Sequence, residues 1–125
     1  MIFMHIKSSK PRKQRLFRLQ APAHARKAFA HSRISKDLIK KLGIKKRSIQ
    51  VRKGDTVKVM TGSNKGKSGK VNKVETKHGV LLIENLTRRN AKGKELQIPI
   101  KTSNVYITDL DLNDKLRKQK LGLKE

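Results

Sequence analysis

The residues of this chain whose types and spacing could do chemistry gather between Gly62 and Lys70. This stretch reads GSNKGKSGK, so glycines and lysines recur through the whole of it. Glycine allows positive φ and close approach of the backbone to another surface. Lysines beside unpaired backbone N–H groups form a cationic concavity suited to phosphate. The crowding of Lys65, Lys67 and Lys70 therefore predicts a rigid turn that contacts the phosphates of a nucleic acid.

The same stretch is similar to a nucleotide-binding P-loop, because Gly62 to Ser68 reads G-x-x-x-G-K-S. A P-loop has four residues between its first glycine and the G-K pair, whereas this chain has three. A P-loop must also open a helix, but residues 70–75 read KVNKVE and lack helical periodicity. These two differences argue against a nucleotide site, and we expect no cofactor and no small-molecule substrate.

Other catalytic and metal-binding groups are sparse. The chain has no cysteine, and its four histidines lack a partner at a diagnostic spacing. The acidic run at residues 109–114 imitates a calcium loop, but Asp114 stands where a glycine is required and Lys120 where a bidentate glutamate is required. We therefore expect no catalytic residue and no metal site, and the chain is not predicted to be an enzyme.

The charge of the chain is extreme for its length. Its 125 residues carry a formal net charge of +24, and only 34% of them are hydrophobic. Residues 1–54 contain 17 Lys and Arg and one acid, whereas residues 55–125 contain 16 and eight acids. Self-repulsion at this charge density favours a permanent polyanionic partner. No apolar run approaches the length needed to cross a bilayer, so we expect no membrane span and a location in an aqueous compartment.

Residues 1–34 are predicted to form a basic arm that becomes ordered on RNA. Pro11 and Pro22, together with the dense cations of residues 10–18, argue against an independent fold there. An organellar transit peptide and a nuclear import patch are alternative interpretations of this segment. The second of these is compatible with RNA binding.

A short helix and linker are predicted over residues 35–50. Ser35 is placed as the N-cap, Ile34 and Ile39 are spaced as a hydrophobic staple, and Gly43 lies just past the helix end. Leucines and isoleucine give the helix one apolar face. We expect that face to pack on the β domain while the lysines point outward.

Residues 51–110 show the alternation of apolar and polar residues that is typical of short β-strands. Val57 and Val59 fall on one face of an extended segment, and Pro99 favours the edge of a sheet. Further strands are predicted at 79–84, 96–100 and 105–110. Five short strands fit a small closed barrel with a thin core, so the predicted fold class is mainly β.

Residues 111–125 are predicted to form a basic C-terminal extension. Asn113 or Asp114 is placed to cap a short helix within it. That helix carries four cations, which we expect to face solvent or RNA: Lys115, Arg117, Lys118 and Lys120.

The segment from Val51 to Glu75 resembles the KOW motif. The whole chain resembles the archaeal and eukaryotic branch of the universal large-subunit ribosomal protein family numbered twenty-four. The matching runs are KPRKQR, APAH, SKDL, VRKGD and SNVYIT. Coverage from about Lys10 to Lys118 is more specific than a KOW motif alone, which also occurs in transcription elongation factors.

This resemblance implies an SH3-like barrel with basic extensions and a structural role without catalysis. It also implies binding to the 5′ region of large-subunit ribosomal RNA, a part in early subunit assembly, and a position near the polypeptide exit tunnel. The partners would be that RNA and neighbouring large-subunit ribosomal proteins, and the location would be cytoplasmic, in the large ribosomal subunit.

The resemblance further implies which residues contact RNA. On the arm and the first helix region they are Lys10, Arg12, Lys13, Arg15, Arg18, His24, Arg26, Lys27, Arg33 and Arg47. In the barrel they are Lys53, Asn64, Lys65, Gly66, Lys67, Arg88 and Arg89. The chain departs from the family pattern at residues 101–102, where His-Pro is usual, and at residues 45–48, which lack the usual proline. The first departure argues against a stacking contact there, and neither changes the expected fold.

Two other functional classes match the sequence less well. An elongation factor with a KOW segment would normally carry a separate mixed α/β domain, whereas residues 1–50 predict only one short helix. A basic chromatin barrel is disfavoured by the long arm and by the lack of aromatic side chains that could wedge between DNA bases. With three Phe and one Tyr, the chain also lacks a base-stacking platform. Recognition is therefore expected to rest on phosphates and RNA shape.

Overall fold

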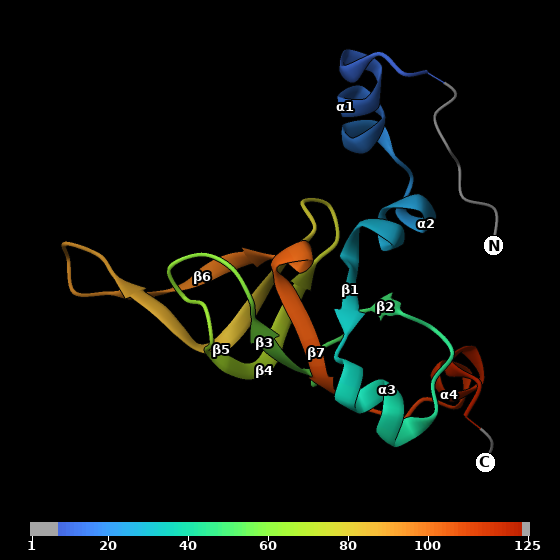
Figure 1. Cartoon of the computed structure of the whole chain (residues 1–125). Helices are drawn as coiled ribbons and strands as arrows, with labels where there is room; N and C mark the ends of the chain where they lie inside the picture. Colours follow the sequence, from blue (N-terminus) through green and yellow to red (C-terminus); the bar gives the residue numbers. More distant parts are fainter. Residues whose placement is uncertain (1–7, 124–125) are drawn as a thin grey trace.

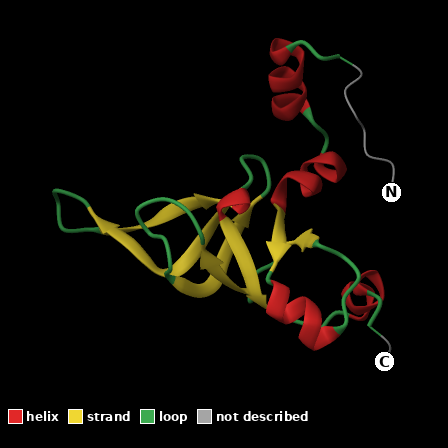
Figure 2. Cartoon of the chain, viewed as in Figure 1, coloured by secondary structure: helices red, strands yellow, loops and turns green. Residues whose placement is uncertain are grey.

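The computed structural model describes residues 8–123 and shows a curved β-sheet with helices at its borders (Figure 1). The strands are β1 (His31–Ile34), β2 (Ser48–Gln50), β3 (Thr56–Val59), β4 (Ser68–Glu75), β5 (Val80–Arg89), β6 (Glu95–Lys101) and β7 (Val105–Asp109). The helices are α1 (Pro11–Gln20), α2 (Ala23–Arg26), α3 (Lys36–Leu42) and α4 (Lys115–Leu121), with two 3₁₀ turns, η1 (Lys27–Ala30) and η2 (Thr102–Asn104). Figure 2 shows that strands form the body of the molecule and helices its periphery.

The strands follow one another across the sheet in the order β2-β1-β7-β3-β4-β5-β6. The pair β1 and β7 is parallel, and the other neighbouring strands are antiparallel. Residues 68–70 of β4 pair with β3, whereas residues 71–75 pair with β5. One strand thus joins the two halves of the sheet.

The mainly β class predicted from the sequence is confirmed, but the closed five-stranded barrel is wrong. The sheet within residues 8–123 has seven strands and two open edges, β2 and β6. Closure fails because β7 already has β3 on one side and β1 on the other, so β6 pairs with β5 alone. The prediction that Pro99 marks an edge strand is confirmed, since it lies in β6.

The core lies on one face of this sheet. On β3, Val57 and Val59 are buried, whereas Lys58 between them is exposed, as the two-residue period of a strand requires. β7 repeats the pattern and places Tyr106 on the outer face. The largest fully buried hydrophobic side chains are Leu81, Ile83, Ile107, Leu121, Val51, Val57, Val59, Val71 and Val105.

In the segment predicted as an arm, one part lies apart from the sheet and another part forms one of its strands. Helix α1 has no buried residue and lies apart from the sheet (Figure 1). Residues 31–34, in contrast, form β1 inside the sheet. There the buried hydroxyl of Ser32 hydrogen-bonds to the carbonyl of Val105 at 2.6 Å. The sequence analysis assigns all of residues 1–34 to the arm, whereas in the structure residues 31–34 belong to the sheet. The pairing of β1 with β7 joins segments more than 70 residues apart, and local sequence carries little signal of it.

Helix α3 forms where the sequence predicts it. The Leu38 backbone N–H donates to the Ser35 hydroxyl at 3.3 Å, and Gly43 ends the helix in the left-handed conformation with φ of 61°. Leu38 is buried, and Ile39 and Leu42 pack against the core. The predicted cap, terminus and apolar face are confirmed.

Helix α4 begins after Asp114, whose carboxylate accepts from the Leu116 N–H at 2.9 Å. The prediction of a capped C-terminal helix is thus confirmed. The expectation that Arg117 faces solvent or RNA is wrong, because both Arg117 and Leu121 are buried. These two residues are four apart, so they lie on one face of the helix and dock it on the sheet.

A buried ion pair holds this helix in place. The guanidinium of Arg117 forms a two-pronged contact with the Asp55 carboxylate at 2.7 and 2.6 Å, and the side chains are 3% and 0% exposed. The Asp55 carboxylate also accepts from the backbone N–H groups of Arg52 and Asp111. Arg117 donates in addition to the Asp111 and Gln50 carbonyls. Neither Asp55 nor Arg117 has a buried side-chain nitrogen or oxygen without a hydrogen-bond partner. This is the condition under which a buried charge pair is tolerated.

Candidate nucleic-acid interface

The loop between β3 and β4, residues 60–67, is here called the lysine tip. Gly62 and Gly66 have φ of 90° and 87°, so both glycines are needed for backbone conformation, as predicted. Lys65 and Lys67 are exposed. The Asn64 side-chain oxygen accepts from the Lys67 ammonium at 3.1 Å and fixes its direction. The tip therefore presents two cations on an ordered loop.

The predicted set of unpaired backbone N–H groups is not found at residues 65–67. The N–H of Lys65 donates to Gly62, that of Gly66 to Val59, and that of Lys67 to Asn64. These bonds fold the loop onto itself and use the amides that a phosphate would need. Binding at these three positions must therefore come from the side chains.

Gly69 serves a different purpose from the one predicted. It lies in β4 with ordinary φ, and a Cβ there would come within 2.8 Å of the Glu84 carbonyl oxygen and 2.9 Å of Ile83. The absent side chain lets β4 and β5 approach closely. Lys70 also lies in β4, so the ordered loop carries two of the three predicted lysines.

The arm contributes the largest group of exposed cations. Arg12, Lys13 and Arg15 project from α1, which buries nothing. Arg18 lies over the ring of Phe29 at 5.1 Å from its centroid, a cation–π contact between α1 and the segment next to β1. Lys10, His24 and Lys27 are exposed, and Arg26 is partly buried.

Arg88 and Arg89 are the last two residues of β5, which is longer than predicted. They pair with Leu96 and Glu95 across the β5–β6 hairpin. The Arg89 Nε donates to the Glu95 carboxylate at 3.2 Å, and both side chains are more than half exposed. Solvent screens such a pair, so Glu95 offsets the Arg89 charge only in part.

The predicted RNA-binding residues do not form one cluster. The arm lies at the β1 end of the sheet, and the β5–β6 hairpin extends away from that end (Figure 1). Arg33 and Arg47 line the same hollow at the border of β1 and β2. Lys53 stands exposed in the turn before β3. The geometry is that of several contact regions on a broad surface.

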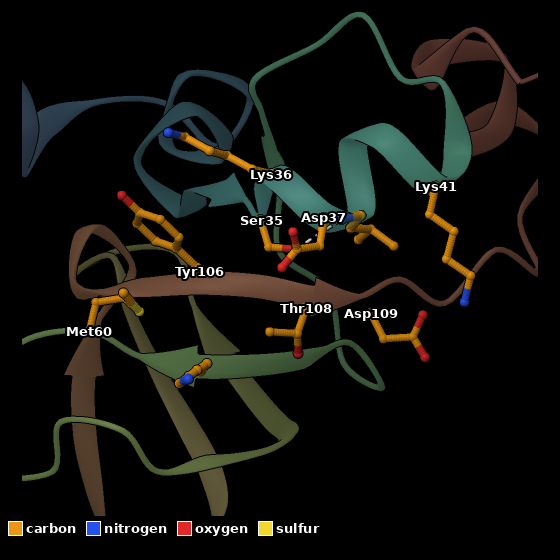
Figure 3. Close-up of a pocket in the computed structure, with 10 residues that line it drawn as sticks. Ser35, Lys36, Asp37, Lys41, Met60, Tyr106, Thr108 and Asp109 are labelled. Carbon is orange, nitrogen blue, oxygen red and sulfur yellow. Dashed lines mark hydrogen bonds between the residues drawn. The ribbon is translucent and has the colours of Figure 1, made fainter.

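Sequence reasoning missed a set of residues beside α3. Lys36, Lys58 and Tyr106 line a hollow between α3 and the outer face of β3 and β7 (Figure 3). The sequence could have revealed one of these residues, because strand alternation places Lys58 on the face of the sheet opposite to that of the buried Val57 and Val59. The proximity of Tyr106 required knowledge of the strand order.

Within residues 8–123, the pKa values of His31 and Asp114 depart from their usual range. Burial is the main cause that lowers the pKa of His31 below 6.5, and nearby Lys120 and Lys46 lower it further. The pKa of Asp114 is lowered chiefly by its hydrogen bond from the Arg52 side chain, with a smaller effect from the Leu116 N–H.

Two further features concern residues 8–123. No group of three or more His, Asp or Glu side chains in that range is placed to hold a metal ion. None of the helices there is both long enough and apolar enough to cross a membrane.

Comparison with known proteins places the chain among ribosomal proteins. Residues 8–124 match the family described as the ribosomal proteins L26 of eukaryotes and L24 of archaea. The chain is 47% identical over 114 residues to the large ribosomal subunit protein uL24 of Saccharolobus solfataricus, an alignment that covers 91% of this chain and 94% of that protein. It is 46% identical over 115 residues to the protein of the same name in Methanospirillum hungatei, covering 92% of this chain and 94% of that one.

These matches confirm the family resemblance that the sequence motifs indicate. They span nearly the whole chain, so they include the arm, the sheet and helix α4. A protein of this kind is a structural component of the large ribosomal subunit in the cytoplasm and not an enzyme. The chain therefore belongs to the family of ribosomal proteins called L26 in eukaryotes and L24 in archaea.

Proposed function

We propose that the chain binds the 5′ region of large-subunit ribosomal RNA through the arm, the lysine tip and the β5–β6 hairpin. By doing so it supports early subunit assembly, and in the finished subunit it lies near the polypeptide exit tunnel beside neighbouring ribosomal proteins. The arm anchors the protein while the sheet positions the tip and the hairpin on phosphates.

The observation that carries this proposal is that most of the predicted RNA-binding cations are exposed and have no acidic side chain paired with them. Of the RNA-binding residues predicted from the sequence, only Arg26 and Asn64 are partly buried, and the rest are exposed. Within residues 8–123, Arg89 is the one member of that set with an ion-pair partner. So many exposed, unpaired cations on a chain of net charge +24 favour a polyanion as the binding partner.

The first test measures affinity for a transcript of the 5′ region of large-subunit ribosomal RNA at several salt concentrations. If the arm and the tip neutralise about eight phosphates, log affinity should fall against log salt with a slope of about −6 to −7. The triple variant Arg12→Gln, Lys13→Gln, Arg15→Gln should make the slope shallower by about 2 to 3, because each lost phosphate contact removes about 0.7 to 0.9.

A matched control replaces two exposed lysines outside the proposed contacts, Lys73→Gln and Lys77→Gln. It should leave the slope nearly unchanged. Far-ultraviolet circular dichroism should show the same unfolding transition for both variants, because exposed lysines and arginines contribute little to folding. A wild-type slope near −2, or an equal change in the control, would contradict phosphate binding by the arm.

A further inference from the structure

Three side chains form a row across the outer face of the sheet. The strand register sets Tyr106 of β7 opposite Arg33 of β1 on one side and Lys58 of β3 on the other. Neighbouring strands lie about 4.8 Å apart, so the three side chains are neighbours. An Arg33 guanidinium nitrogen donates to the Tyr106 hydroxyl at 3.3 Å. We call Arg33, Tyr106 and Lys58 the tyrosine row.

Two hollows meet at the tyrosine row, and Tyr106 lines both of them. The first, of about 600 Å³, lies between α3 and the outer face of β3 and β7 (Figure 3). The second, of about 410 Å³, lies over β1 and β2. Tyr106 is partly exposed, and its side chain is not among those of the core. An aromatic ring is thus held open between two cations, with room on both sides.

We propose that the tyrosine row binds one unpaired nucleotide of RNA, whose base stacks on Tyr106 while Arg33 and Lys58 contact the flanking phosphates. Stacking on an exposed aromatic ring is how proteins hold bases that are splayed out of a helix. The inference rests on the proposed RNA binding and deepens it, because it requires a single-stranded position in the bound RNA rather than backbone contacts alone.

The charges around the two hollows orient the nucleotide. Arg33 and Arg47 line the second hollow without an acidic side chain, so it favours phosphate. The first hollow contains Asp37 and Asp109 as well as three lysines. In Figure 3, Asp109 and Lys41 lie at the far end of this hollow from Tyr106. Carboxylates accept hydrogen bonds from base amino groups, so the base is expected on this side, with Lys58 as the cation for the phosphate next to it.

The composition of the chain provides a direct readout, because Tyr106 is its only tyrosine and it has no tryptophan. Full-length protein with isotope-labelled tyrosine gives one set of ring signals by nuclear magnetic resonance. A single-stranded RNA of about 12 adenines and cytosines, within the site sizes of single-strand binders, should shift these signals upfield through the ring current of a stacked base. A blunt RNA duplex of the same length should leave them in place.

Two substitutions separate stacking from the hydroxyl contact. Tyr106→Leu should weaken binding of the single-stranded RNA about 5-fold to 150-fold, the range that corresponds to one base stacked on one aromatic ring. Tyr106→Phe keeps the ring and should bind within about 3-fold of the wild type, because it loses only the contact between Arg33 and the hydroxyl. Duplex affinity should be the same for all three proteins.

The outcomes distinguish this inference from the proposed function. If the wild type binds single-stranded RNA but the tyrosine signals do not move, and Tyr106→Leu binds equally well, the tyrosine row is not a nucleotide site. RNA binding by the arm and the tip would then stand, and the hollow would be left for a protein neighbour. If the wild type binds neither RNA, both proposals fail.

Discussion

The two ends of the chain carry basic helices of similar composition that are held in opposite ways. Helix α1 has no side-chain cap and no buried residue. Helix α4 is capped by Asp114 and buries Arg117 and Leu121. Leu19 of α1 is 64% exposed, whereas Leu121 of α4 is 2% exposed. Arg12, Lys13 and Arg15 of α1 are thus exposed and free for a partner, while one cation of α4 belongs to the core.

The difference does not arise from the amount of positive charge. It arises because the sheet offers a buried carboxylate, Asp55, that α4 can reach and α1 does not. A run of lysines and arginines in a sequence therefore does not reveal which cation is structural. The acid that selects it lies 62 residues away along the chain.

The largest effect should follow from breaking the ion pair at α4. Arg117→Met leaves the Asp55 carboxylate buried without its cation, and we expect a loss of about 3–5 kcal/mol in the free energy of unfolding. Urea unfolding followed by circular dichroism measures this. Lys115→Met, an exposed position on the same helix, should change stability by less than about 0.5 kcal/mol.

A second substitution tests whether the loss comes from the unpaired charge of Asp55. Adding Asp55→Asn to Arg117→Met should recover part of the loss, because the side chain is then uncharged yet its oxygen can still accept from one backbone N–H. Full recovery is not expected, since the Asp55 carboxylate serves the N–H groups of both Arg52 and Asp111. An Arg117→Met variant as stable as the wild type would mean that α4 is not held by this pair.

A pair of matched leucine substitutions tests the contrast between the two helices directly. Leu121→Ala should cost about 2–5 kcal/mol in the free energy of unfolding, because it removes a buried side chain and leaves a cavity. Leu19→Ala should cost less than about 0.5 kcal/mol, because its side chain already faces solvent. Equal losses in urea unfolding would show that α1 packs on the sheet in solution.

Local features of the fold were predictable from the sequence. The Ser35 cap, the Gly43 terminus and the alternation of Val57 and Val59 each depend on residues within one turn or one strand. The contacts between β1 and β7 and between Asp55 and Arg117 depend on residues far apart in the sequence. No local pattern specifies them, so the number of strands and the docking of α4 were missed.

The same limit applies to the candidate interface. The sequence located the lysine tip because its glycines and lysines are contiguous. It did not reveal that the amides of residues 65–67 are already hydrogen-bonded within the loop. It likewise dismissed Tyr106 as an isolated aromatic residue, because its cationic neighbours come from two other strands.

The smallest predicted effect concerns His31, on which a lysine of the C-terminal helix α4 acts electrostatically. His31 begins β1, at the root of the arm, and Lys120 of α4 is one of the charges that lower its pKa. Because the pKa is lowered in the folded state, the unfolded chain takes up the proton first as pH falls through 6.5. Stability from neutral His31 is therefore complete above that pH and declines below it.

Urea unfolding at pH 7.5 and 5.5 measures this decline. His31→Gln should make stability less dependent on pH over this interval, and Lys120→Gln should do so in part, because it removes the second cause of the shift. Lys118→Gln is the matched control, because Lys118 lies on the same helix but is not one of the charges that lower the pKa of His31. It should leave the pH dependence of stability unchanged. If Lys120→Gln and Lys118→Gln behave alike, the field of α4 does not reach β1. Docking of the C-terminal helix would then have no electrostatic effect at the root of the arm, and the two ends would be independent.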